Sequence, residues 1–431
     1  MAWDFETEPE FQEKLDWMRR FIDETLIPLE PMVEERSAED WAPLKRWLQQ
    51  QVKEQGLWAC HLDPELGGPG YGQMKLALMH ELIGRSPYSM EIFGNQAPDS
   101  GNMELLASGA NEEQKQRWLW PNLEGSKRSA FALTEPFAAG ADPTRLNTTA
   151  TRDGDDWVID GHKWFCTNGS FADFIIVMAE TNPEGRPYQH ASMFVVDQGT
   201  PGMNIVRDIP TMHHVDPEFG RLGNHAEIRF EACRVGPEHL IGSPGDGFVL
   251  AQKRLGGGRL HHAMRFIGLA QRALDILCER AVSRESHGRP LAKHQMIQDF
   301  VATSKMEIEG ARLITFQAAW KMDKIGGRAA RADISMAKAC ASKMLLAVLD
   351  RAIQVCGALG YSGDLPLEGW YRTHRFAPIG DGPDEIHKIV VARAELGRFQ
   401  PVEGWPSEHI PTRHEPARRL FEELLVQAKG A

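Results

Sequence analysis

The sequence predicts an α+β protein built from a helical N-terminal domain, a middle domain of antiparallel strands and a C-terminal four-helix bundle. Apolar residues recur every three or four positions toward both ends of the chain, as in amphipathic helices. Between these regions, short β-rich runs alternate with turn residues. With 431 residues, the chain is also too long for one small core. We place the domains at residues 1–128, 129–243 and 244–431.

The N-terminal domain begins with two amphipathic segments. The first apolar face comprises Phe11, Leu15, Met18, Ile22, Leu26 and Leu29. The second comprises Trp41, Leu44, Trp47, Leu48 and Val52. Gly56 is placed to end the second helix, and a third helix is expected over residues 73–83. The glycine-rich residues 64–70 do not follow a strand, so we interpret them as a turn and not as a dinucleotide-binding loop.

The middle domain is predicted from four short β-rich runs. They cover residues 157–159, 174–179, 193–196 and 226–230, and in the last run apolar residues alternate with polar ones. Strands of this length and spacing indicate a small antiparallel sandwich or barrel that ends near Gly242.

Helical periodicity returns from about Gly247 and continues over three long segments. Residues 260–283, 292–325 and 329–356 are each long enough to cross a bundle, and Gly326 and Gly327 are placed to separate the last two.

Composition excludes several classes of function. A formal net charge of -12 argues against nucleic-acid binding, which needs concentrated lysine and arginine. The six cysteines are widely spread without CxxC spacing, so we expect reduced thiols. The N-terminal residues lack the features of a targeting segment, and no apolar run approaches the length of a membrane helix. We expect a protein of the bacterial cytoplasm that does not enter a membrane.

A metal site is not expected. His261 and His262 are adjacent, and neighbouring residues on a helix point about 100° apart, so both cannot bind one ion from the same face. The triple glycine at residues 256–258 lacks the lysine of a phosphate-binding loop and is better explained by a close approach of backbone to a ligand.

Four motifs stand in a fixed order along the chain. They are Phe131-Ala-Leu-Thr-Glu-Pro136, Gly161-His-Lys-Trp-Phe-Cys-Thr-Asn-Gly169, Gly268-Leu-Ala-Gln-Arg-Ala273 and Gln354-Val-Cys-Gly-Ala-Leu-Gly-Tyr361. Their order and spacing resemble the acyl-CoA dehydrogenase family over residues 10 to 400. The resemblance implies that family's fold, FAD as cofactor and an acyl-CoA thioester as substrate.

The reaction that the resemblance implies converts an acyl-CoA into its trans-2-enoyl form, as in the β-oxidation of fatty acids. A carboxylate takes the α-proton and flavin N5 takes the β-hydride. Asp381, in the segment Gly380-Asp-Gly-Pro-Asp-Glu385, stands at the family's usual base position. The family's donors to the thioester carbonyl are a flavin ribityl hydroxyl and the backbone N–H of the base, which here is that of Asp381.

Further site residues follow from the resemblance, position by position. Matches to cofactor contacts are Phe131, Leu133, Thr134, Phe165, Thr167, Arg284, Ser286, His294, Gln295, Gln354, Gly357, Pro383 and Glu385. Among these, Gln354, Gly357 and the start of the last helix match contacts to FAD bound by a neighbouring subunit. Matches to substrate contacts are Arg259, Ala141 and Gly382.

The chain departs from the family pattern at four places. Asp381 stands where most members have Glu, and Gly258 occupies the second position at which some members carry the base. The loop over residues 134–142 is one residue longer, with Ala141 in place of a serine, and Phe165 replaces a tryptophan. This combination is similar to the branch with an Asp base that includes family members ten and eleven and bacterial relatives.

Asp381 also has a structural interpretation, because it directly precedes a predicted helix that starts with Pro383. It could help cap that helix, although we assign capping to Asp384 and Glu385 and the base to Asp381. Burial against flavin and substrate is expected to raise the pKa of Asp381.

The resemblance also implies partners and leaves two other functions open. It implies a homo-oligomer, dimer or tetramer, and electron-transfer flavoprotein as electron acceptor. One alternative is a flavin oxidase of the same fold, similar to nitroalkane oxidases, which also use Asp as base. The other is a non-catalytic acyl-CoA-binding protein.

Overall fold

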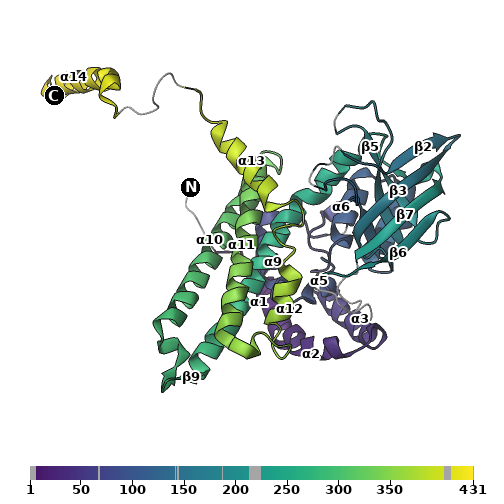
Figure 1. The fold of residues 1–431 in the computed structure, drawn as a ribbon, viewed down its shortest axis with the longest axis horizontal. Coiled ribbons are helices and arrows are strands. Elements are labelled where there is room, and N and C mark those ends of the chain that lie inside the picture. The colour runs from purple at the N-terminus through teal and green to yellow at the C-terminus, as the bar shows by residue number, and fades with distance from the viewer. Residues whose placement is uncertain are drawn as a thin grey trace.

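The computed structural model describes residues 6–66, 68–140, 142, 145–186, 188–212, 225–401 and 409–430. Helices come first, then a β-sheet, then a long helical bundle, so the predicted fold class is confirmed. Figure 1 shows the sheet to one side of the bundle, with the N-terminal helices packed between and below them. The limits that we place between the domains stay a prediction.

The N-terminal helices pack one apolar face into a shared core. The elements are α1 (Pro9–Phe21), η1 (Ile22–Leu26), α2 (Ile27–Glu35), α3 (Ala38–Glu54), η2 (Pro64–Leu66), α4 (Gly72–Ile83), α5 (Ser89–Ile92), α6 (Asp99–Gly109), α7 (Glu112–Gln114), η3 (Lys115–Leu119) and α8 (Trp120–Glu124). The predicted face of the first helix is buried from Phe11 to Leu26. On α3, in contrast, Leu44 and Trp47 are exposed, because the buried stripe of that helix consists of Trp41, Leu48 and Val52.

The middle domain forms one mixed sheet. Its strands are β1 (Ser129–Ala132), β2 (Thr149–Asp153), β3 (Asp156–Thr167), β4 (Phe174–Glu180), β5 (Ala191–Asp197), β6 (Met203–Ile209), β7 (His225–Val235) and β8 (Leu240–Ile241), with η5 (Pro237–His239) before β8. The order is β6-β7-β3-β2-β4-β5-β8, with β1 also paired to β4. Most pairs are antiparallel as predicted, whereas β1 and β2 each pair with β4 in parallel.

Strands β4 and β5 are buried on both faces. Ile175 and Val177 point into the core of the sheet, whereas Ile176 and Val195 pack against Leu105 and other residues of the N-terminal helices. Two-sided burial explains why these strands read as continuous apolar runs and not as alternating ones.

The C-terminal bundle is formed by α9 (Gly247–Ser283), α10 (Gln295–Ile325), α11 (Arg331–Cys356) and α13 (Asp384–Leu396). Shorter elements are β9 (Glu285–Ser286), β10 (Arg289–Pro290), η6 (Leu291–Lys293), η7 (Gly357–Leu359), α12 (Leu367–His374), η8 (Pro411–Arg413) and α14 (Glu415–Gly430). The first bundle helix begins at residue 247, so the triple glycine lies inside α9. Within the described residues, no helix is long and apolar enough to cross a membrane.

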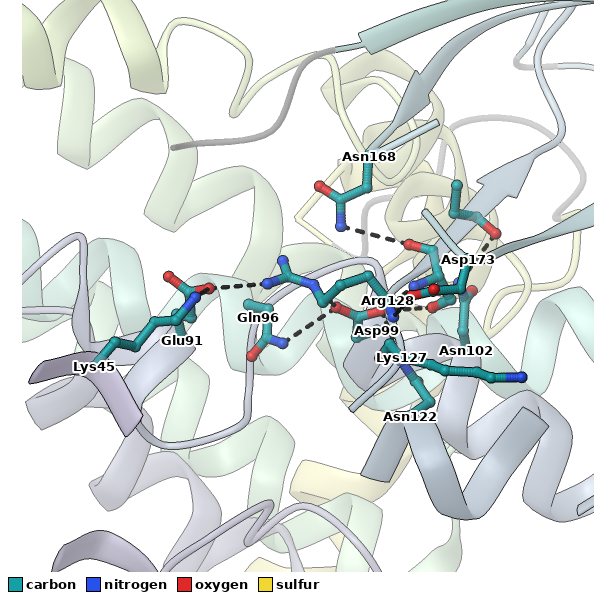
Figure 2. Close-up of polar contacts among 12 residues, drawn as sticks. Lys45, Glu91, Gln96, Asp99, Asn102, Asn122, Lys127, Arg128, Asn168 and Asp173 are labelled. Carbon is teal, nitrogen blue, oxygen red and sulfur yellow. Dashed lines mark hydrogen bonds and ion pairs between the residues drawn. The ribbon is translucent and has the colours of Figure 1, made fainter. Parts of the chain in front are cut away.

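A polar network joins the N-terminal helices to the sheet (Figure 2). Glu91 pairs with Lys45 and with Arg128, each at 2.9 Å, and Arg128 also reaches the fully buried Asp99. Asp99 accepts hydrogen bonds from the backbone and the hydroxyl of Ser129, at 2.7 and 2.6 Å. The start of β1 is therefore fixed to α6, which also packs against α9.

Candidate functional site

Asp381 lies on a tight loop between α12 and α13 whose backbone is held by side chains from three helices. Its φ is +55°, and that of Gly382 is +98°. Arg259 Nε donates to the Asp381 carbonyl oxygen at 3.0 Å, and His387 Nε2 donates to the same oxygen at 3.2 Å. Lys338 Nζ donates to the carbonyl oxygen of Gly382 at 3.0 Å. Left-handed backbone at a non-glycine residue is uncommon, and here the donors stabilise it.

The first turn of α13 corrects one expectation about capping. Asp384 is buried and pairs with the buried Lys338 at 2.8 Å, so its carboxylate serves an interior ion pair and caps nothing. Glu385 is exposed in the same turn, where its charge faces the positive end of the helix. Pro383, which precedes this turn, begins the helix without a side-chain cap.

The carboxylate of Asp381 lies beside His262 and under the influence of three arginines. Its Oδ2 lies 3.3 Å from His262 Nε2, and the side chain is 31% exposed. Burial raises the pKa of Asp381, but His262 and the guanidinium groups of Arg254, Arg259 and Arg265 outweigh burial and lower it below its ordinary value. The expectation of a raised pKa is therefore wrong for the protein alone, because the sequence did not reveal how many arginines surround this acid.

A polar cavity of about 50 Å³ borders Asp381. Its walls include four histidines, at positions 61, 80, 261 and 262, together with Arg254 and Arg265. Burial lowers the pKa of all four histidines, to about 4 for His61 and for His262, so they are neutral at neutral pH. Burial also raises the pKa of Glu104, on the same wall, to about 8.

The predicted flavin-contacting segment is held to β3 by a buried ion pair. Lys163 Nζ lies 2.8 Å from Glu135 Oε1 and donates to the carbonyl oxygen of Leu133 at 3.0 Å. The Thr134 carbonyl oxygen accepts a hydrogen bond from the backbone of Trp164 at 3.0 Å. Leu133 and Thr134 therefore have a fixed position beside β3.

Two further predicted cofactor residues lie at an irregularity in β3. The pairing of β3 with β7 shifts register between Lys163 and Cys166, and Phe165, within this shift, has a φ of +51°. A bulge of this kind redirects side chains, and Phe165 is 44% exposed. Thr167 Oγ1 is hydrogen-bonded to His225 Nδ1 at 2.9 Å. Nearby, the guanidinium of Arg254 lies 4.1 Å above the ring of Phe131.

Six further predicted cofactor residues lie at the opposite end of the bundle from Asp381. Arg284, Ser286, His294 and Gln295 gather around the β9–β10 hairpin, where His294 Nε2 donates to the Ser286 carbonyl oxygen at 3.2 Å. Gln354 and Gly357 are exposed at the end of α11. The 25 residues of helix from Arg259 to Arg284 span roughly 37 Å. One chain therefore does not bring this group together with Asp381 and Phe165.

A predicted substrate residue, Ala141, and the second base position, Gly258, have different outcomes. Ala141 lies outside the described residues. Gly258 lies within α9 and borders the cavity, and a Cβ added there would meet no atom within 4 Å. Within the described residues, no cluster of three or more His, Cys, Asp or Glu side chains could hold a metal ion.

Sequence reasoning missed several residues of this site: Arg254, His262, Arg265, Lys338 and His387. The spacing of Arg254, Gly258, His262 and Arg265 by three or four residues could have placed them on one face of a helix. Nothing in the sequence indicated that this face is directed at Asp381.

Three family models match successive parts of the chain. They describe the N-terminal, middle and C-terminal domains of acyl-CoA dehydrogenase and match residues 8–126, 130–233 and 245–396. A Mycobacterium abscessus structure described as an acyl-CoA dehydrogenase is 38% identical, with a TM-score of 0.87 over 92% of this chain and 100% of that one.

Two curated relatives add to this comparison. A probable acyl-CoA dehydrogenase of Mycobacterium tuberculosis is 43% identical over 83% of this chain and 86% of its own length. Acyl-CoA dehydrogenase family member 10 of Mus musculus is 40% identical over 90% of this chain. The chain spans only 37% of the length of the mouse protein.

Proposed function

Because the chain belongs to the acyl-CoA dehydrogenase family, whose members are FAD-binding oxidoreductases, we propose that it oxidises an acyl-CoA thioester to the trans-2-enoyl-CoA. In this proposal Asp381 takes the α-proton. The observation that carries it is the Asp381 carboxylate at the border of the cavity, on a loop held by Arg259, His387 and Lys338.

The protonation state of Asp381 suits a base. Its pKa is lowered by His262 and the surrounding arginines, so the carboxylate is ionised at neutral pH and can accept a proton. Aspartate is shorter than glutamate, so its reach depends on where the backbone stands. The donors to the carbonyl oxygens of Asp381 and Gly382 fix that backbone and therefore the direction of the side chain.

The same loop offers a donor for the thioester carbonyl. Among the hydrogen bonds of the described residues, none uses the backbone N–H of Asp381. This N–H can therefore donate to the carbonyl oxygen of the substrate and stabilise the negative charge that develops there when the α-proton leaves.

The residues on the sheet side of the site fit a flat aromatic cofactor. Phe165 is turned outward by the β3 irregularity, and Leu133 and Thr134 are fixed by the Lys163–Glu135 pair. Together with Phe131 and Thr167, they would hold the ring system of FAD. Bound FAD supplies the acceptor for the hydride that leaves the β-carbon.

The distal group would act in a second copy of the chain. Arg284, Ser286, His294, Gln295, Gln354 and Gly357 lie at the opposite end of the bundle from Asp381, and roughly 37 Å of helix separates Arg284 from Arg259. We propose that these six residues contact the cofactor of a neighbouring subunit. For Pro383 and Glu385, which lie within four residues of Asp381, a cofactor contact across the subunit interface stays a prediction of the resemblance. A homo-oligomer, dimer or tetramer, follows from this arrangement. We further propose that electron-transfer flavoprotein accepts the electrons.

Anaerobic flavin bleaching tests the proposal. Mixing FAD-loaded protein with acyl-CoAs of different lengths is expected to bleach the flavin, whereas Asp381→Asn is expected to bind FAD but to lose bleaching. Asp364→Asn, at an exposed aspartate in the turn before α12, is the matched control and should behave as the native protein. Bleaching of Asp381→Asn at a near-native rate would show that Asp381 is not the base. Rapid reoxidation by oxygen with peroxide release would indicate an oxidase instead.

A further inference from the structure

Arg265 is a buried cation without a carboxylate partner. It lies on α9, is 7% exposed and lines the cavity beside Asp381. Its Nη1 donates to the Asn95 carbonyl oxygen at 3.1 Å and contacts Met90 Sδ at 2.9 Å, while its Nε has no hydrogen-bond partner. Within the described residues it forms no ion pair. Buried charges are normally paired, because leaving water without compensation is unfavourable.

Unpartnered histidine nitrogens lie in the same cavity. His80 is 1% exposed, and neither of its ring nitrogens has a hydrogen-bond partner. Its ring stacks on His261 with centroids 4.2 Å apart, so its orientation is fixed. His61 Nε2, on the same wall, is also buried without a partner. An alkyl chain would leave the donors Arg265 Nε–H and the N–H of His80 unsatisfied.

The charges around the cavity do not balance. Arg254, Arg259 and Arg265 all act on Asp381, which is the one ionised acid among the described residues of the cavity wall, since Glu104 is protonated at neutral pH. Arg259 is held at the Asp381 carbonyl, and Arg254 lies over Phe131. Arg265 instead reaches the loop at Asn95, on another wall of the cavity. Its charge is therefore free to compensate a ligand.

We propose that the acyl group of the substrate carries a carboxylate, which lies against Arg265 and accepts hydrogen bonds from Arg265 Nε and His80. This inference rests on the proposed function, and it names Arg265 and His80 as the residues that determine acyl specificity. A planar carboxylate matches a guanidinium, and Arg265 Nε–H and the single N–H of neutral His80 offer one donor to each of its two oxygens.

A matched series of probes tests the charge of the acyl group. Hexanoyl-CoA, hydroxyhexanoyl-CoA and adipyl-CoA have the same chain length and end in a methyl, a hydroxyl or a carboxylate. We expect kcat/KM for anaerobic flavin reduction to be higher for adipyl-CoA than for hexanoyl-CoA by about tenfold or more, the size expected for a hydrogen bond to a charged group. An equal or higher value for hexanoyl-CoA or for the hydroxyl form would overturn the carboxylate assignment.

Binding gives a readout that is independent of turnover. The thioethers S-hexyl-CoA and S-(5-carboxypentyl)-CoA lack the carbonyl and cannot react, so calorimetry with the FAD-loaded protein reports affinity alone. The carboxylated thioether should bind about tenfold more tightly. Equal affinities would contradict a role for Arg265 in recognition.

Two substitutions locate the effect, and a third is the control. Arg265→Leu and His80→Phe should each remove most of the preference for the carboxylated probe. His80→Phe breaks no hydrogen bond within the described residues and retains a ring against His261, so it tests the proposal if Arg265→Leu fails to fold. His190→Phe replaces an equally buried histidine with an unpartnered Nε2 just before β5, and it should keep the preference.

The outcomes separate this inference from the function on which it rests. If no acyl-CoA bleaches the flavin, the proposed dehydrogenase activity is wrong. If hexanoyl-CoA bleaches it as efficiently as adipyl-CoA, the activity stands and the carboxylate assignment is wrong. If adipyl-CoA is preferred but His80→Phe leaves the ratio unchanged, the assignment of the carboxylate to His80 and Arg265 is wrong.

Discussion

Arg259 Nε donates to the backbone carbonyl oxygen of Asp381 at 3.0 Å and thereby holds the loop that carries the proposed base. The arginine comes from α9 and the aspartate from the loop before α13, so the contact joins two elements that are 122 residues apart. The geometry of this contact leads to one prediction, and the charges around the Asp381 carboxylate lead to another.

Arg259→Met should slow flavin reduction at saturating substrate by about 10- to 100-fold, because Asp381 loses a donor that fixes its backbone. FAD content and KM should change much less than kcat. Arg259→Lys keeps the charge but not the donor geometry, so its kcat should lie between that of the native protein and that of Arg259→Met. Stopped-flow reduction compares the three proteins, and native kcat in Arg259→Met would remove the positioning role.

The pH dependence of flavin reduction follows from the lowered pKa of Asp381. A base must be ionised, so activity is lost as pH falls through its pKa, and the native rate should stay flat from neutral pH down to about pH 5. Arg254→Met removes one of the charges that lower this pKa. The pH at which its activity is lost on acidification should therefore be higher than in the native protein. If Arg254→Met loses activity at the same pH as the native protein, Arg254 does not influence the pKa of the base.

Lys338→Met should destabilise the fold by about 3–5 kcal/mol, because it leaves the buried carboxylate of Asp384 without its partner. Lys343→Met, at an exposed position of α11, is the matched control and should change stability little. Thermal unfolding of both FAD-loaded variants measures the difference. Equal melting temperatures would show that the Lys338–Asp384 pair contributes no stability.

A glutamate at residue 258 should partly replace the base. Gly258 lies on α9 at the cavity, and a side chain there would meet no atom within 4 Å of its Cβ. In the Asp381→Asn background, Gly258→Glu should recover flavin reduction by about tenfold or more over the single variant. Gly258→Gln in the same background has the same size without the base and should recover nothing. Equal rates for both double variants would exclude a relocated base.

Much of the fold could be predicted from the sequence because periodicity reports burial. The first helix and the bundle show this well, since their apolar stripes face large cores. Periodicity does not predict the structure where the burial of a residue departs from the apolar pattern, or where glycines continue a helix. Trp47 belongs to an apolar pattern but lies on the surface, and the triple glycine did not interrupt α9. The packing of neighbouring elements decides both cases.

The candidate site could be predicted only in part. The motifs pointed to Asp381, Arg259 and residues of the sheet, and Arg254, which lines the cavity beside Asp381, lies over the ring of Phe131. The roles of these residues stay predictions. The motifs could not locate the polar cavity, because His80 and Arg265 come from helices 185 positions apart in the chain. Only the packing of α4 on α9 brings those side chains together.

Exchange of the substrate α-proton with solvent deuterium tests the central claim most directly. An acyl-CoA analogue whose β-position cannot give up hydride can lose and regain its α-proton without net oxidation, and mass spectrometry follows deuterium uptake. We predict exchange with the native FAD-loaded protein and none above background with Asp381→Asn of equal FAD content. Exchange by Asp381→Asn at the native rate would contradict the assignment of Asp381 as the base.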